Sequence, residues 1–158
     1  MARELITSWG DYQTAIDRLL AIACQKICIY DEDLGNLKLE AALRLPQIQR
    51  VLLAGHRESL QIIVRNADPL RNRSPLLIKL LADFSHLSVA QQSPPHLGNL
   101  RDSMLIIDDK YALIRFERDL PRSKLLINEA EELKPYLSRF TELLAAGGEP
   151  ISTSTLGL

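Results

Sequence analysis

Residues 100–116 read LRDSMLIIDDKYALIRF, and they decide how the chain folds. Two apolar runs, at 103–108 and 111–116, are separated only by Asp109 and Lys110. Two such runs joined by so short a polar link predict an antiparallel hairpin. Side chains alternate along a strand, and both alternating sets within 101–108 are mostly apolar. We therefore expect this first strand to lie at the centre of a sheet with both of its faces covered.

The segments on either side supply further strands and the helices between them. Uninterrupted apolar runs at 26–30, 60–66 and 87–92 are typical of strands buried on both faces. Helical spacing of apolar residues occurs at 11–24, 37–57, 74–86 and 128–148, and Pro46 is expected to divide the second of these into two short helices. Segments 67–73 and 117–127 are interpreted as loops.

This order of elements predicts the fold class. Helices that alternate with buried strands indicate an α/β protein, with a mainly parallel or mixed sheet, helices on both faces and the hairpin attached to the sheet. We expect one domain over residues 1–158, a length that can bury a continuous core. Residues 1–9 and 151–158 are expected to be flexible termini or an edge strand.

The composition excludes several classes of function. Lysine plus arginine number 19 against 20 aspartate plus glutamate, so no overall field attracts nucleic acid or an anionic membrane. No apolar run approaches the roughly 20 residues of a membrane helix, and the first residues lack the apolar core of a secretory signal. A cytoplasmic protein without membrane contact is expected. No phosphate-binding loop, dinucleotide fingerprint or nucleophile elbow is present, so we expect no cofactor.

A basic segment offers a candidate anion site. Arg65 and Asn66 end a buried strand, where open α/β sheets place their ligands, and Arg71 and Arg73 follow within a few residues. Arg101 and Ser103 are added to this set from the hairpin strand. The alternative is a solvated basic loop that faces the acidic start of the last helix.

Two carboxylates raise the question of a metal ion. Asp31 and Asp33 follow the first buried strand, where they suggest magnesium or, equally, side chains that cap a turn. The two cysteines and three histidines are too few and too scattered for a zinc site. We expect no metal.

The hairpin and the order of elements resemble the phospholipase D-like superfamily. That family's signature is His-x-Lys, four residues, then Asp, on a strand that leads into a hairpin. Its aspartate corresponds to Asp108, and its histidine and lysine correspond to Arg101 and Ser103. A guanidinium is no nucleophile, and a serine lacks the lysine's charge, so the resemblance implies a half-domain without catalytic residues.

The resemblance also implies partners. Half-domains of this superfamily pair about a two-fold axis, which predicts a homodimer. The chain also resembles degenerate phospholipase D-like domains of this size that are found beside or fused to bacterial GNAT acetyltransferases. An acetyltransferase is therefore a candidate partner.

Three hypotheses for function follow. The first is a non-catalytic interaction or regulatory module. The second is a phosphate- or nucleic-acid-binding module that uses Arg65, Arg71, Arg73 and Arg101. The third is an enzyme of unrecognised chemistry around Asp31, Asp33 and Asp108.

Overall fold

The computed structural model describes residues 2–153, whose strands form one eight-stranded sheet in the order β1-β7-β6-β5-β2-β3-β4-β8. The strands are β1 (Ala2–Ile6), β2 (Ile27–Asp31), β3 (Leu60–Val64), β4 (Ser88–Gln92), β5 (Ser103–Ile107), β6 (Tyr111–Arg115), β7 (Ser123–Ile127) and β8 (Glu149–Pro150). Strands β2, β3 and β4 are parallel, whereas β5, β6, β7 and β1 continue the sheet in antiparallel pairs. The sheet is therefore mixed, with the predicted hairpin β5–β6 built into it.

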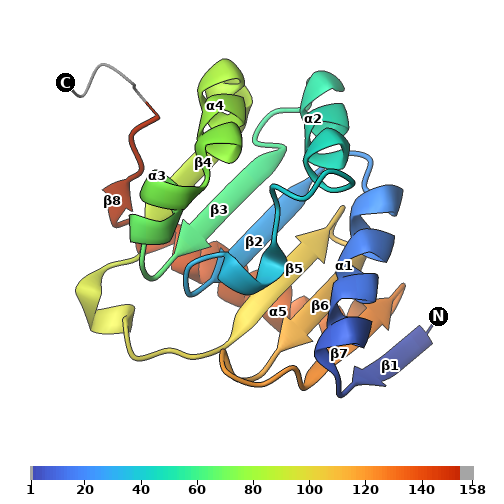
Figure 1. Cartoon of the computed structure of the whole chain (residues 1–158). Helices are drawn as coiled ribbons and strands as arrows, with labels where there is room; N and C mark the ends of the chain where they lie inside the picture. The colour runs from blue at the N-terminus through green and yellow to red at the C-terminus, as the bar shows by residue number, and fades with distance from the viewer. Residues whose placement is uncertain (1, 154–158) are drawn as a thin grey trace.

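Helices cover both faces of this sheet, as the sequence predicted (Figure 1). One face carries α1 (Trp9–Ile22), α2 (Leu45–Leu53), α3 (Asp68–Arg73) and α4 (Pro75–Asp83), and the other carries α5 (Ala130–Ala145). Three short 3₁₀ turns, at Gly35–Leu37, Ser85–Leu87 and Pro95–Leu97, lie in the connections. Two separate apolar cores result, one on each face.

The central placement of the hairpin strand is confirmed. Strand β5 pairs with β2 on one side and β6 on the other, and Leu105 and Ile106 are each only 1% exposed. The two side chains point to opposite faces, so both cores use this strand. Burying such side chains on both faces contributes on the order of 1.5–3 kcal/mol each, which explains why the pattern is so strongly marked in the sequence.

Two segments that we expected to be loops are regular structure. Residues 117–127 contain β7, whose polar Lys124 is accommodated by an ion pair with Glu132 of α5. Residues 67–73 contain α3, which starts with Asp68 and Pro69 in its first turn. The N–H groups of the first helical turn have no partner within the helix, so the N–H that proline lacks is not missed there. Proline therefore favours the start of a helix.

The segment from Leu37 to Arg57 is one helix rather than the expected two. Pro46 lies in the first turn of α2 and begins the helix instead of interrupting one. The residues before it are held as an irregular segment by Arg44, which is 5% exposed. Its guanidinium donates to the carboxylate of Asp17 at 2.7 Å, to the side-chain oxygen of Gln13 at 2.6 Å and to the carbonyl oxygen of Leu37 at 2.6 Å.

The chain ends are partly ordered into the sheet. Residues 2–6 form the edge strand β1 along β7, one of the two alternatives that the sequence left open. At the other end β8 ends at Pro150, and Ile151 donates a backbone hydrogen bond to Ala90 at 3.0 Å. Of the segment expected as a flexible end or an edge strand, residues 151–153 are not in a strand, and residues 154–158 lie outside the described residues. Within residues 2–153 no helix is both long and apolar enough to span a membrane.

Candidate functional site

The ends of three adjacent strands bring together a buried ionic cluster. Asp31 ends β2, Ser103 begins β5 and Arg115 ends β6, and the three residues are 1%, 2% and 1% exposed. The Nη2 of Arg115 donates to Oδ1 of Asp31 at 2.8 Å and to Oγ of Ser103 at 3.0 Å, and Ser103 donates its hydroxyl hydrogen bond to the same carboxylate oxygen. A buried charge is tolerated only when paired and hydrogen-bonded, and here one pair satisfies both charges.

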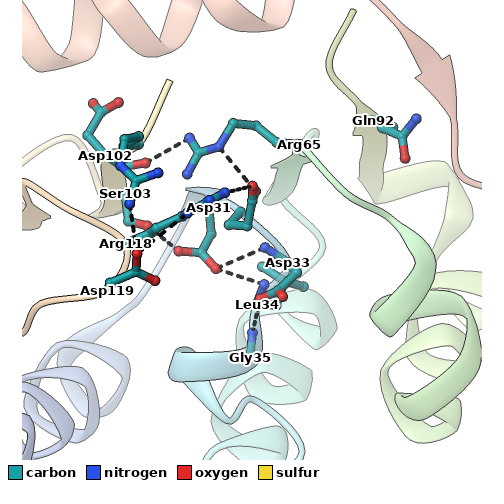
Figure 2. A network of polar contacts seen from close by, with 12 residues as sticks. Asp31, Asp33, Leu34, Gly35, Arg65, Gln92, Asp102, Ser103, Arg118 and Asp119 are labelled. Carbon is teal, nitrogen blue, oxygen red and sulfur yellow. Dashed lines mark hydrogen bonds and ion pairs between the residues drawn. The ribbon is translucent and has the colours of Figure 1, made fainter. Parts of the chain in front are cut away.

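The surroundings of the cluster complete its hydrogen bonds. The second oxygen of Asp31 accepts from the backbone N–H of Leu34 at 2.7 Å (Figure 2). The guanidinium carbon of Arg115 lies 5.5 Å and 5.2 Å from the ring centres of Trp9 and Tyr12 of α1. Burial raises the pKa of the Tyr12 phenol, against the opposing effect of Arg115, so that Tyr12 stays neutral. One polar atom of the cluster, Nε of Arg115, is buried without a hydrogen-bond partner, and Asp31 and Arg115 also line the cleft described below.

Arg101 lies outside this cluster and has its own carboxylate partners. Its Nε donates to both oxygens of Glu117 at 2.6 and 2.7 Å, and its Nη2 donates to Asp119 at 2.7 Å. The hydrogen bond from Arg101 lowers the pKa of Glu117, which keeps that carboxylate charged. Arg101 is thus neutralised by the β6–β7 loop.

Asp108 lies at the far end of β5 from Ser103. Its carboxylate accepts three backbone hydrogen bonds, from Cys24 at 2.9 Å, Gln25 at 2.7 Å and Lys26 at 2.8 Å. These N–H groups belong to the turn that leads from α1 into β2. Asp108 therefore fixes this turn to the hairpin. The three positions that the sequence resemblance assigned to the family motif are divided between the two ends of one strand.

A polar cleft of about 360 Å³ opens beside the buried cluster. Its walls hold four carboxylates, two guanidinium groups and two amides, from Asp31, Glu32, Asp33, Asn36, Asn66, Arg115, Arg118 and Asp119. Arg118 Nη1 donates to Glu32 at 2.7 Å. The excess of carboxylates disfavours an anion in the open part of the cleft.

The two carboxylates that suggested magnesium are used in local turns. Asp31 accepts from the backbone N–H of Leu34, and Asp33 accepts from that of Gly35 at 2.8 Å (Figure 2). Within residues 2–153 no three His, Cys, Asp or Glu side chains are grouped so as to hold a metal ion. In this part of the chain the turn-forming alternative accounts for both carboxylates.

The candidate anion residues are spread over several places. Asn66 lines the cleft, whereas Arg71 and Arg73 lie exposed on α3 and are not among the cleft residues. Arg71 faces Asp68 at 4.0 Å and Glu149 at 3.7 Å. Arg65 is buried behind the cleft, where its Nη1 donates to the carbonyl oxygen of Asp102 at 2.8 Å (Figure 2).

Sequence reasoning missed the residues that organise this end of the sheet, above all Arg115, Arg118 and Arg139. Arg139 of α5 pairs with the carboxylate of Asp102 through two hydrogen bonds of 3.1 and 2.8 Å. For Arg115 a signal was available, because a charged residue within the apolar run at 111–116 must either end the strand or find a buried partner.

Solved structures with this fold share little sequence with the chain. The archaeal chromatin protein TrmBL2, described as showing a novel mode of DNA binding, matches with a TM-score of 0.68 and 14% identity over 94% of this chain and 54% of its own. NucT from Helicobacter pylori matches with a TM-score of 0.63 and 14% identity over 94% of this chain and 98% of its own. Nuc from Salmonella typhimurium, a phospholipase D family member, matches with a TM-score of 0.60 and 11% identity over 96% of this chain and 99% of its own.

These matches establish a phospholipase D-like fold, as the sequence resemblance predicted. The chain spans about half the length of the TrmBL2 chain. No curated protein matches the sequence. A family model described as a domain of unknown function, DUF7931, matches residues 9–148, which is most of the chain.

Proposed function

The chain belongs to the DUF7931 family, and we propose that it is a non-catalytic phospholipase D-like domain that serves as an interaction or regulatory module. One observation carries the proposal. Ser103, which stands where the superfamily has the motif lysine, is buried in an ionic cluster with Asp31 and Arg115. Arg101, which stands where the superfamily has the nucleophilic histidine, is held by Glu117 and Asp119.

The chemistry of these groups supports a loss of catalysis. Phosphodiester cleavage by this superfamily needs an imidazole as nucleophile and a second imidazole as general acid. The guanidinium of Arg101 stays protonated and offers no lone pair. The hydroxyl of Ser103 is 2% exposed and already donates to Asp31. Neither group presents a nucleophile to the cleft.

A turnover assay tests this proposal. The purified chain is incubated with bis-p-nitrophenyl phosphate and with a short oligonucleotide, with and without magnesium, beside Ser103→Ala and the cleft control Asn36→Ala. We expect no hydrolysis above the background of buffer in any sample. Turnover that disappears in Ser103→Ala and persists in Asn36→Ala would refute the non-catalytic assignment, provided that both variants keep the native circular dichroism spectrum.

The module is proposed to act as a homodimer, because a half-domain with this fold leaves its pairing surface in water unless a second copy covers it. The charge of Arg101 is compensated within the chain by Glu117 and Asp119, so two copies can approach without an ion between them. Light scattering at micromolar concentration should give twice the 17.8 kDa of one chain. A mass of one chain at all concentrations would exclude the dimer.

A second candidate function is binding of phosphate or nucleic acid through Arg65, Arg71, Arg73 and Arg101. The fold shared with a DNA-binding chromatin protein favours it. Binding to heparin or a short duplex should weaken steeply as salt rises if arginines contact phosphates. Two of the four, Arg71 and Arg101, would first have to release their carboxylate partners, so absence of binding at low salt would remove this candidate.

The partner of such a module is proposed to be an acetyltransferase of the GNAT class, encoded beside the chain or fused to it. Co-expression and co-purification of the neighbouring protein would test this. The third hypothesis, an enzyme built on Asp31, Asp33 and Asp108, requires these carboxylates to share one site. Asp108 and Asp31 lie at opposite ends of the β2–β5 pair, about 17 Å apart at roughly 3.3 Å per residue, so one site cannot include both.

A further inference from the structure

Unpartnered polar atoms are concentrated at one place in the fold. Among the described residues, nine buried side-chain nitrogen and oxygen atoms lack a hydrogen-bond partner, and five of these belong to Tyr30, Glu32, Arg65 and Ser93. Buried polar groups in folded proteins are almost always bonded, so such a concentration calls for an explanation.

These four residues share one face of three parallel strand ends. Tyr30 and Ile63 are register partners whose side chains lie in the core beneath α5, and Ile63 pairs in turn with Gln91. Because side chains alternate along a strand, Glu32, Arg65 and Ser93 project from the next row on the same face. The carbon of the Arg65 guanidinium lies 4.9 Å from the centre of the Tyr30 ring.

The free donors of Arg65 are arranged to receive two oxygens. Its Nη1 donates to Asp102, whereas Nε and Nη2 lack partners. The N–H groups of Nε and Nη2 lie on one edge of the guanidinium, the edge that pairs side-on with carboxylate or phosphate. The side chain is only 1% exposed, so this edge is buried, and its polar neighbours include Oε2 of Glu32, 3.7 Å from Nε, and the hydroxyl of Tyr30, whose pKa burial raises and Arg65 lowers.

The two carboxylates near Arg65 each have a closer cationic partner. Arg118 pairs with Glu32 at 2.7 Å and Arg139 pairs with Asp102 at 2.8 Å, which accounts for both carboxylates. The nearest oxygen of Glu32 to Arg65 Nε lies at 3.7 Å, beyond hydrogen-bond range. A small anion on this edge of Arg65 would supply the close partner that neither carboxylate gives to Nε and Nη2.

Glu32 restricts which anion fits. Its Oε2 is buried without a hydrogen-bond partner and faces the free Arg65 donors, so a ligand there must accept from Arg65 and donate to Glu32. An inorganic phosphate or a phosphomonoester, whose second pKa is about 6, keeps such a proton on a substantial fraction of molecules at slightly acidic pH, whereas a phosphodiester, a carboxylate and sulfate do not. Arg65 does not line the polar cleft, but Glu32 and Asn66, its neighbour in the chain, do, so the cleft ends beside this site.

We propose that Arg65, Glu32 and the hydroxyls of Tyr30 and Ser93 form a binding site for a protonated phosphate group, either inorganic phosphate or a phosphomonoester. The site is separate from the Asp31–Ser103–Arg115 cluster, which lies on the opposite face of the sheet. It requires no turnover and no phosphodiester. Its test is therefore independent of the test of the non-catalytic function.

The test compares anions by calorimetry and by amide chemical shifts at about pH 6.5. Inorganic phosphate and phenyl phosphate are titrated as the two sources of the group, with sulfate and dimethyl phosphate as probes that lack the proton. We expect phosphate to bind at least about tenfold more tightly than sulfate. Protonated phosphate donates a hydrogen bond of about 1.5 kcal/mol to Glu32, whereas the oxygens of sulfate repel that carboxylate. Binding of phenyl phosphate as well as phosphate assigns the site to monoesters, and binding of phosphate alone assigns it to the free ion.

Variants distinguish this site from unspecific anion binding. Arg65→Met should abolish phosphate binding, and the matched control Arg57→Met, at an exposed position in the turn before β3, should leave it unchanged. If Arg65→Met fails to fold, Glu32→Gln serves instead: the amide can donate to a fully deprotonated oxygen, so the preference for phosphate over sulfate should disappear. No phosphate binding up to about 10 mM, equal affinities for phosphate and sulfate in the unmodified chain, or a preference that survives in Glu32→Gln would overturn the proposal.

Discussion

Asp108→Asn offers the sharpest test of how the hairpin is fixed in the fold. The aspartate carboxylate accepts the backbone N–H groups of Cys24, Gln25 and Lys26, the first on Oδ2 and the other two on Oδ1. Asparagine has the same size and tolerates the left-handed backbone at this position, where φ is 55°. The substitution therefore changes the hydrogen bonds and leaves the backbone requirement unaltered.

The magnitude follows from the three hydrogen bonds. Each bond to a charged acceptor at this partly exposed site contributes about 1.5 kcal/mol, and a neutral one contributes about 1 kcal/mol. The amide oxygen of asparagine retains two neutral bonds, and its NH₂ group faces the third N–H without accepting from it. The net loss is about 2.5 kcal/mol, which for a chain of this size lowers Tm by about 5–10 °C.

Urea and thermal denaturation of Asp108→Asn and Asp109→Asn measure this difference. Asp109 also has φ near 55°, but its carboxylate makes an exposed ion pair with Lys26 at 3.0 Å, so its substitution should cost less than about 0.5 kcal/mol. Equal effects of the two substitutions would refute the structural role of Asp108. Loss of a measurable turnover in Asp108→Asn without loss of stability would point instead to the enzymatic hypothesis.

Three further predictions concern other parts of the fold. Burial raises the pKa of Cys28 to about 12, so iodoacetamide at about pH 8 should modify only the exposed Cys24. Mass spectrometry of the native chain should show one adduct, and two adducts would contradict this prediction. The hydrogen bond from Lys124 lowers the pKa of Glu132, so the charged Glu132 carboxylate stabilises the fold above the usual value of 4.5, and this stabilisation is lost as pH falls through the lowered value. Between about pH 5 and 3, the free energy of unfolding measured in urea should therefore fall less for Glu132→Gln than for the unmodified chain. Arg50 donates to three carbonyl oxygens at the end of α1, at 2.7 to 3.4 Å, and Arg50→Met should cost about 1–2 kcal/mol in thermal denaturation; no change would mean that water replaces the guanidinium.

The buried strands were predictable from the sequence because their side chains face apolar surroundings on both sides. Strands β2, β3 and β5 are buried at every position, and a strand buried on both faces favours a nearly uninterrupted apolar run in the sequence. Strand β7 was missed because its Ser123 and Lys124 follow a polar segment with Pro121, and its apolar part is only three residues long. Helix α3 was missed because six residues are too few to display helical spacing.

The candidate site was less predictable, because it depends on contacts between residues far apart in the chain. Asp31 and Arg115 are separated by 84 positions, and Arg65 and Arg139 approach Asp102 from different elements. Hydrophobic spacing places a residue on an element but says nothing about which charged groups meet at the strand ends. The resemblance to a known superfamily located the relevant strand, yet it could not show that new partners had closed around positions 101 and 103.

These new partners make the departure from the motif a property of the whole strand end rather than of two residues. Asp31 is buried and needs a cation, which Arg115 supplies, and Ser103 fits between them as a small neutral donor. Lysine at position 103 would place a second cation near Arg115 around a single carboxylate, in a space that is 2% exposed. Histidine at position 101 would give up the hydrogen bonds that Arg101 makes to Glu117 and Asp119. Restoring the motif residues alone would therefore disturb the cluster before it rebuilt a catalytic site.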